Sequence, residues 1–266
     1  MYNNYHGYDA SENMPEDFLT SHQAWDDFVS SVWAGVMRDT SMDVNAPSLE
    51  IGPGNSTKIA GALASIEFQS SLCILDMNAE ALDAVAPKYE AMLPDVNMSW
   101  VANSLEEFSP PQGAQLLASH MLDDILVSTA IRLEQNGQEA GRWGAHYTHA
   151  PSEHLQALWQ KLNDDGALLK AVSDASFEAV KGFIDSMQPQ LLIFSQYPSA
   201  TLGDHGLSCA NRAATDLLER LRSHFSDKTI PKGRLQDSLD KNPHYRNAHI
   251  GENLLNAGYW WAARWS

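Results

Sequence analysis

The chain has 266 residues, of which 44 % are hydrophobic, and this size fits one large domain or one domain with an attached cap. Its 34 acidic and 17 basic residues give a formal net charge of −17, which argues against a nucleic-acid partner and favours a small or cationic substrate. No apolar run reaches the length of a membrane span, and the polar, acidic beginning differs from a secretory leader. We therefore expect a cytoplasmic protein without membrane contact, in which Cys73 and Cys209 are reduced core thiols.

The predicted elements begin with a helix over residues 15–38, whose apolar side chains recur every three or four positions. After a polar connector, strands and helices alternate. In chain order we expect a strand at 48–51, a helix from Thr57, a strand at 71–75, a helix at 79–93, strands at 96–103 and 113–119, and a helix at 123–137. The second half contains a predicted helix at 174–187, a strand at 190–197, a helix at 207–225 and a last strand within 258–265.

This alternation predicts an α/β fold, a doubly wound and mostly parallel sheet with right-handed crossovers. Residues 1–44 are expected to form an N-terminal helical cap or lid, and residues 45–266 the sheet domain. The segment 139–173 interrupts the alternation, so we interpret it as an insertion into that domain.

The stretch SLEIGPGNSTKIA, Ser48 to Ala60, places two glycines directly between a strand and a helix. A tight turn needs only one glycine, whereas a ligand lying across the turn requires that side chains be absent. In an open parallel sheet, ligands bind beyond the carboxyl ends of the strands, near such a turn. The spacing lacks the third glycine of a dinucleotide-binding G-x-G-x-x-G motif.

The sequence from Glu50 to Gly54 resembles motif I of the class I S-adenosylmethionine (SAM) dependent methyltransferase family. Asp76 resembles the acid that binds the ribose hydroxyls in that family, and LLASHMLDDI, residues 116–125, resembles its motif IV. The third glycine of motif I is replaced by Ser56, and Asn103 stands where the family usually has an acid.

The resemblance implies a Rossmann-like, seven-stranded sheet with an antiparallel last strand, helices on both faces and a helical cap. It also implies that SAM is bound as cosubstrate or as sole substrate. The residues that it implies for this binding are Glu50, Gly52, Gly54, Ser56, Asp76, Met77, Asn103, Ser104, Ser119 and His120.

Three polar residues follow the fourth strand. Asp123 and Asp124 are candidates for a catalytic base or an anchor for a substrate ammonium, but acids also stabilise the beginning of a helix. His120 is a candidate base, and in the family this position commonly lines the SAM pocket.

The insertion and the N-terminus supply aromatic candidates. Trp143 and Tyr147 could line a pocket and attract a cation, or they could simply pack within the loop. Tyr147 is also a catalytic candidate. Tyr5 and Tyr8 suit a lid or a disordered terminus. The neighbouring histidines lack the spacing of zinc ligands, so no metal site is predicted. The aromatic N-terminus is compatible with pairing of two chains in a homodimer.

Three functions remain open from the sequence. The first is methyl transfer from SAM to an oxygen, nitrogen or carbon nucleophile of a small molecule, as in secondary metabolism. The second releases methylthioadenosine, either through cyclisation of SAM, as in azetidine-2-carboxylate synthases that resemble methyltransferases, or through aminocarboxypropyl transfer. The third is a non-catalytic SAM-fold binding module, which the retained Gly52, Gly54 and Asp76 argue against.

Overall fold

The computed structural model describes residues 22–134, 153–198, 206–241 and 253–265. Their centre is a six-stranded sheet in the order β3-β2-β1-β4-β5-β6. The strands are β1 (Ser48–Ile51), β2 (Ser71–Asp76), β3 (Asn97–Ala102), β4 (Gln115–Ser119), β5 (Leu192–Ser195) and β6 (Trp260–Ala263). All neighbouring strands run parallel except β5 and β6. The predicted mostly parallel sheet with an antiparallel last strand is therefore confirmed.

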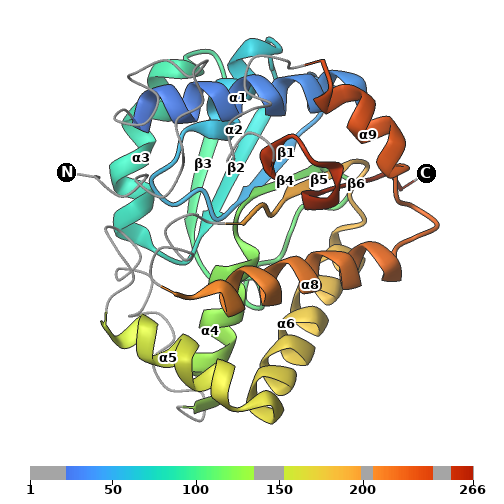
Figure 1. Ribbon diagram of the computed structural model, residues 1–266. Coiled ribbons are helices and arrows are strands. Elements are labelled where there is room, and N and C mark those ends of the chain that lie inside the picture. The colour runs from blue at the N-terminus through green and yellow to red at the C-terminus, as the bar shows by residue number, and fades with distance from the viewer. Residues whose placement is uncertain (1–21, 135–152, 199–205, 242–252, 266) are drawn as a thin grey trace.

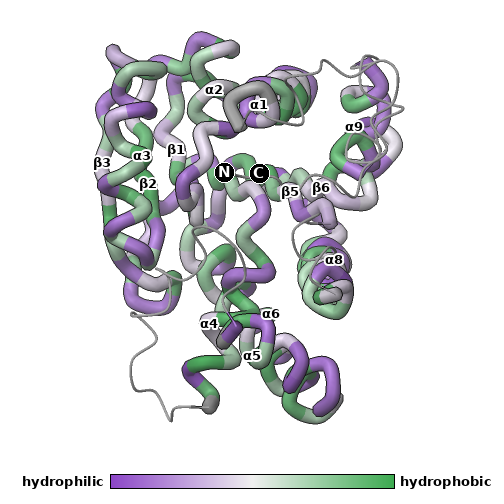
Figure 2. Tube along the Cα trace, turned by 60° about the vertical axis from the view of Figure 1, so that its left-hand side comes forward, coloured by the Kyte–Doolittle hydropathy of each residue, from purple (hydrophilic) through white to green (hydrophobic). Residues whose placement is uncertain are grey.

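Helices cover both faces of the sheet, as predicted (Figure 1). One face carries α1 (His22–Asp39), α2 (Lys58–Ser65), α3 (Ala79–Met92) and α9 (Lys232–Leu239). The other carries α4 (Leu122–Glu134), α5 (Glu153–Asp164), α6 (Gly166–Met187) and α8 (Ser208–His224). In Figure 2, α1 and α2 of the first group lie at the top of the view, and α4, α5 and α6 of the second lie at the bottom. No helix within the described ranges is both long and apolar enough to cross a bilayer.

Helix α1 packs into the core of the sheet domain. Val29, Val32, Trp33 and Val36 are fully buried because the apolar residues of this helix recur on one face. It lies close against α2, where a Cβ atom on Gly61 would lie 2.5 Å from the Ser30 hydroxyl. The segment that would extend α1 into a lid lies outside the described residues.

Helix α6 begins earlier than the sequence predicted. It starts at Gly166, eight positions before the expected residue 174, because the Asp165 side chain accepts hydrogen bonds from the backbone N–H groups of Ala167 and Leu168. Such capping satisfies donors that have no partner within the helix. Helix α9 was not predicted at all.

The predicted seventh strand is absent from the described residues. Thr229 forms only an isolated antiparallel bridge with Ala263, beside the edge strand β6. The Ile230 N–H still donates to the Ala262 carbonyl at 2.8 Å. The next residue, Pro231, has no N–H to continue a ladder and leads directly into α9.

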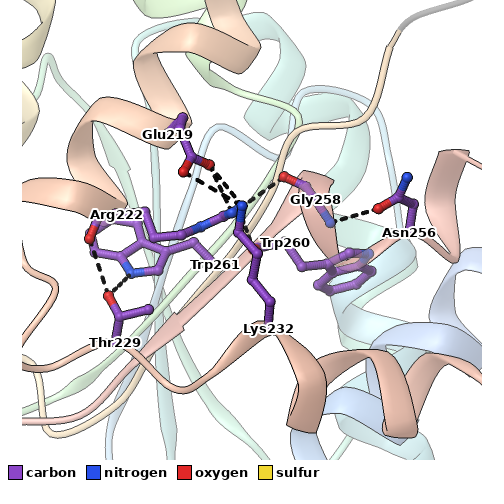
Figure 3. A network of polar contacts seen from close by, with 8 residues as sticks. All are labelled: Glu219, Arg222, Thr229, Lys232, Asn256, Gly258, Trp260 and Trp261. Atoms are coloured by element: carbon purple, nitrogen blue, oxygen red, sulfur yellow. Dashed lines mark hydrogen bonds and ion pairs between the residues drawn. The ribbon is translucent and has the colours of Figure 1, made fainter.

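A buried arginine holds the end of the chain against α8 (Figure 3). Arg222 donates from Nη2 to the carbonyls of Gly258 at 2.9 Å and Trp260 at 2.6 Å, and pairs through Nη1 with Glu219 at 2.8 Å. Burial lowers the pKa of Arg222. These bonds satisfy carbonyls at the beginning of β6, so the network positions the last strand.

Candidate active site

The strand register brings the predicted site to one edge of the sheet. Ile51 of β1 pairs with Leu75 of β2 and with Ala118 of β4. Gly52, Asp76 and Ser119, which follow these residues, therefore lie at the same level. Strand β1 also pairs with β2 on one side and β4 on the other, which is the switch in strand order where doubly wound sheets bind ligands.

The two glycines of the turn after β1 have positive φ angles, which glycine adopts more easily than other residues. Gly52 and Gly54 have φ values of 64° and 55°. A Cβ atom on Gly52 would lie 3.1 Å from the Met121 Cβ, so the turn also approaches the segment after β4. Among the residues that the structure describes, a Cβ atom on Gly54 would meet nothing within 4 Å. The turn therefore leaves open space above Gly54, which fits a ligand that lies across the backbone.

Asp76 is oriented by this turn. Its Oδ2 accepts the Gly54 N–H at 3.0 Å, and its Oδ1 accepts the Asn78 N–H at 2.8 Å. Burial raises the pKa of Asp76, while the two N–H bonds act in the opposite direction. Each carboxylate oxygen has a second lone pair, so each can accept one further hydrogen bond. Beside it, the Asn103 side chain accepts the Ser104 N–H at 2.8 Å.

Glu50 lies in the core beneath the turn. The Tyr89 hydroxyl of α3 lies 2.9 and 3.0 Å from its two carboxyl oxygens and 3.3 Å from the Ser56 carbonyl. Burial raises the pKa of Glu50 to about 8, the Tyr89 hydrogen bond opposes this rise, and the charge of Asp76 adds to it. Glu50 is therefore a neutral carboxylic acid at pH 7, and a SAM contact of this residue stays a prediction.

Thr57, the residue before α2, is held by a side chain that the sequence did not suggest. Asp26 of α1 accepts hydrogen bonds through Oδ2 from the Thr57 N–H at 2.9 Å and the Thr57 hydroxyl at 3.1 Å. The Ser56 hydroxyl lies 3.5 Å from the same oxygen. Asp26 lies 31 positions from Thr57 in the sequence, so no local motif could have indicated this contact.

A second polar group lies after β4 and β5. The Gln196 side chain accepts the Leu122 N–H at 2.9 Å and donates to Asp123 Oδ1 at 3.0 Å. The same oxygen lies 3.5 Å from His120 Nδ1. Burial raises the pKa of Asp123, but His120 and the Gln196 amide outweigh it, and the pKa lies below its usual value. The structure thus brings two predicted residues, His120 and Asp123, directly together. It adds Gln196, a partner of Asp123 that the sequence did not indicate.

Three other predicted residues lie nearby. The Met77 sulfur faces α4 and accepts a hydrogen bond from the Ser128 hydroxyl at 3.3 Å. Asp124 is half-buried in the first turn of α4. The hydroxyl groups of Ser119 and Ser195 are 3.3 Å apart at the ends of β4 and β5.

The remaining predicted residues, Tyr5, Tyr8, Trp143 and Tyr147, lie outside the described residues. Among the residues that the structure describes, no three histidine, cysteine, aspartate or glutamate side chains gather as metal ligands would.

No protein-family model matches the sequence, and no curated protein is significantly similar to it. Among solved structures, the chain is distantly similar to YjhP from E. coli, with 10 % identity over 92 % of this chain and 95 % of that one, at a TM-score of 0.36. The O-MT segment of StiE has 10 % identity over 86 % and 71 % of the two chains, at a TM-score of 0.31. YcgJ from Bacillus subtilis has 13 % identity over 76 % and 91 %, at a TM-score of 0.28.

Proposed function

We propose that this chain is a SAM-dependent enzyme that transfers the SAM methyl group to a small molecule. The observation that carries the proposal is the position of Asp76 at the end of β2, beside the open glycine turn. A carboxylate there can accept hydrogen bonds from both hydroxyls of a ribose. No described residue lies within 4 Å of where a Gly54 side chain would begin, which leaves room there for the rest of the nucleoside.

The contact between Asp26 and Thr57 favours SAM over a dinucleotide. A dinucleotide places its pyrophosphate at the N-terminus of the helix after the glycine turn, where free N–H groups attract anions. Here the Asp26 carboxylate already accepts the Thr57 N–H and hydroxyl. A second anion at this position would be repelled, whereas SAM has no phosphate and carries a positive sulfonium.

Replacing Asp26 with alanine is expected to reduce the stability of the protein and to let it bind phosphate-containing nucleotides more tightly. Loss of hydrogen bonds to a charged group costs about 1.5–3 kcal/mol, which denaturant unfolding would measure. Calorimetric titration with ADP should show tighter binding to the variant than to the wild-type protein, because the carboxylate that repels the phosphates is gone. Asp27→Ala, one position along α1, serves as the control. Equal ADP affinity in the wild-type and Asp26→Ala proteins would contradict this role of Asp26.

The acceptor is expected to be small and not strongly anionic, because the chain carries a net charge of −17. In methyl transfer, a lone pair of the acceptor attacks the methyl carbon in line, and the carbon–sulfur bond breaks with its electrons moving to sulfur. The protein contributes by holding the two reactants in this geometry.

The test is to titrate the purified protein with SAM by calorimetry, and then to incubate it with SAM and a panel of phenols and amines. Mass spectrometry should detect S-adenosylhomocysteine and a methylated acceptor. Accumulation of methylthioadenosine from SAM alone, above the spontaneous breakdown of SAM, would instead show that another carbon–sulfur bond is broken. Absence of SAM binding would overturn the proposal.

A further inference from the structure

The Gln196 side chain fixes the protonation pattern of its neighbours. The Leu122 N–H is a donor, so the side-chain atom of Gln196 that it contacts at 2.9 Å must be the amide oxygen. The amide nitrogen therefore points to Asp123 Oδ1, 3.0 Å away, and donates to it. The Oδ1 atom of Asp123 is thus fixed in place as a hydrogen-bond acceptor.

The same oxygen then determines which nitrogen of His120 carries the proton. Oδ1 of Asp123 faces His120 Nδ1 at 3.5 Å. Because Oδ1 accepts the Gln196 N–H, it also presents a lone pair to Nδ1. An acceptor oxygen favours a hydrogen on the nitrogen that it faces, so neutral His120 is the Nδ1–H tautomer and its lone pair is on Nε2.

Two further observations single out His120. Its Nε2 is shielded from water and, among the described residues, has no hydrogen-bond partner, which is uncommon for a buried polar atom. Its backbone has a φ of 62°, in the left-handed region that few non-glycine residues adopt. The ring is fixed edge-on against Tyr197, with 4.7 Å between the ring centroids. The histidine is therefore held rigidly at the end of β4, beside Met121, which contacts the glycine turn.

We propose that His120 is the proton acceptor of the reaction, acting through Nε2, and that Gln196 is a positioning residue that sets its tautomer through Asp123. This inference rests on the proposed SAM-dependent function. The acceptor's O–H or N–H proton moves to Nε2, and the Asp123 carboxylate stabilises the resulting imidazolium. The lone pair released on the acceptor forms the new bond to the methyl carbon, and the sulfonium leaves as a neutral thioether.

The inference narrows the substrate class. A base is needed only when the nucleophilic atom carries a proton at neutral pH, as in a phenol or an ammonium group. A carboxylic acid is already ionised and would need no proton acceptor. The panel of acceptors should therefore contain phenols and amines, with a simple carboxylic acid as the negative probe.

The first test requires no acceptor. Long-range ¹H–¹⁵N spectra of the ¹⁵N-labelled full-length protein at neutral pH distinguish the two neutral histidine tautomers, and His120→Asn identifies the signals of His120. We expect the Nδ1–H form for His120. In Gln196→Met the carboxylate loses its fixed orientation, so we expect the signals to average between the two tautomers. Gln160→Met, an exposed change on α5, should leave them unchanged.

Each outcome is decisive. An Nε2–H tautomer in the wild-type protein would overturn the assignment of Nε2 as proton acceptor, and identical spectra in Gln196→Met would overturn the positioning role of Gln196. With a phenol or amine that the wild-type protein methylates, His120→Asn should lower turnover at saturating SAM about 10²- to 10⁴-fold. Unchanged turnover would remove His120 as the base. Absence of SAM binding in the wild-type protein would instead contradict the proposed function and leave the tautomer result standing.

Discussion

Replacing Glu50 with glutamine is expected to make the protein more stable at alkaline pH and to remove a large part of its pH-dependent loss of stability. The folded protein holds the Glu50 carboxyl with a pKa of about 8, against an ordinary value of 4.5, because the residue is buried. Between these two pH values the unfolded chain has released this proton and the folded chain keeps it. The free energy of unfolding therefore falls as pH rises from about 4.5 to 8, and it levels off above that range.

The size of this effect follows from the shift in pKa. One pKa unit corresponds to about 1.4 kcal/mol, so the whole shift of the Glu50 pKa changes the free energy of unfolding by roughly 3–5 kcal/mol. Glutamine has nearly the same shape and can still accept the hydrogen bond of Tyr89, but it has no proton to lose. The variant should therefore equal or exceed the wild-type stability at pH 9.

Urea unfolding at pH 5, 7 and 9 measures this prediction. The slope of stability against pH should be clearly smaller in Glu50→Gln than in the wild-type protein. Glu90→Gln is the matched control, since Glu90 is exposed on the same helix as Tyr89, and its effect should stay within about 0.5 kcal/mol. Parallel curves for the wild-type and Glu50→Gln proteins would show that Glu50 is not held neutral in the folded state.

Asp76→Ala is expected to weaken SAM binding by about 1–3 kcal/mol, roughly a 5- to 150-fold rise in Kd. The variant removes the carboxylate proposed to accept the ribose hydroxyls. It also removes the acceptor that holds the Gly54 N–H at 3.0 Å, so the turn loses one of its fixed points. Both losses act on the nucleoside end of SAM.

Isothermal titration calorimetry with SAM checks this expectation, with unfolding curves to confirm that the variant is folded. Asp83→Ala, an exposed change on α3, is the control and should bind SAM as the wild-type protein does. The SAM affinity of Asp76→Asn should lie between those of the wild-type protein and Asp76→Ala, because its amide retains one acceptor oxygen. If Asp76→Ala bound SAM with unchanged affinity, Asp76 would have no role in binding the ribose.

The sequence by itself determined most of the architecture and the place of the candidate site. The periodicities of two for strands and near 3.6 for helices depend only on neighbouring residues, so they predicted all six strands. The antiparallel direction of the last strand was an implication of the family resemblance. The glycines and Asp76 could be located because each directly follows an apolar strand, and parallel strands end at one edge. The apolar pattern does not show the Asp165 cap, which starts α6 early. It also does not show the effect of Pro231, which ends the pairing beside β6 and begins α9.

Only the tertiary structure decided the partners of the site residues. Asp26 reaches Thr57 across 31 positions, Tyr89 reaches Glu50 across 39, and Gln196 reaches Asp123 across 73. These contacts form because helices and strands pack at fixed angles and registers, which bring together side chains that no local pattern connects. The protonation of Glu50 and the tautomer of His120 depend on those partners and on burial, since a charge is costly where water is excluded. The chemistry proposed for the site therefore depends on the packed molecule, although the residue types proposed to perform it are already present in the sequence.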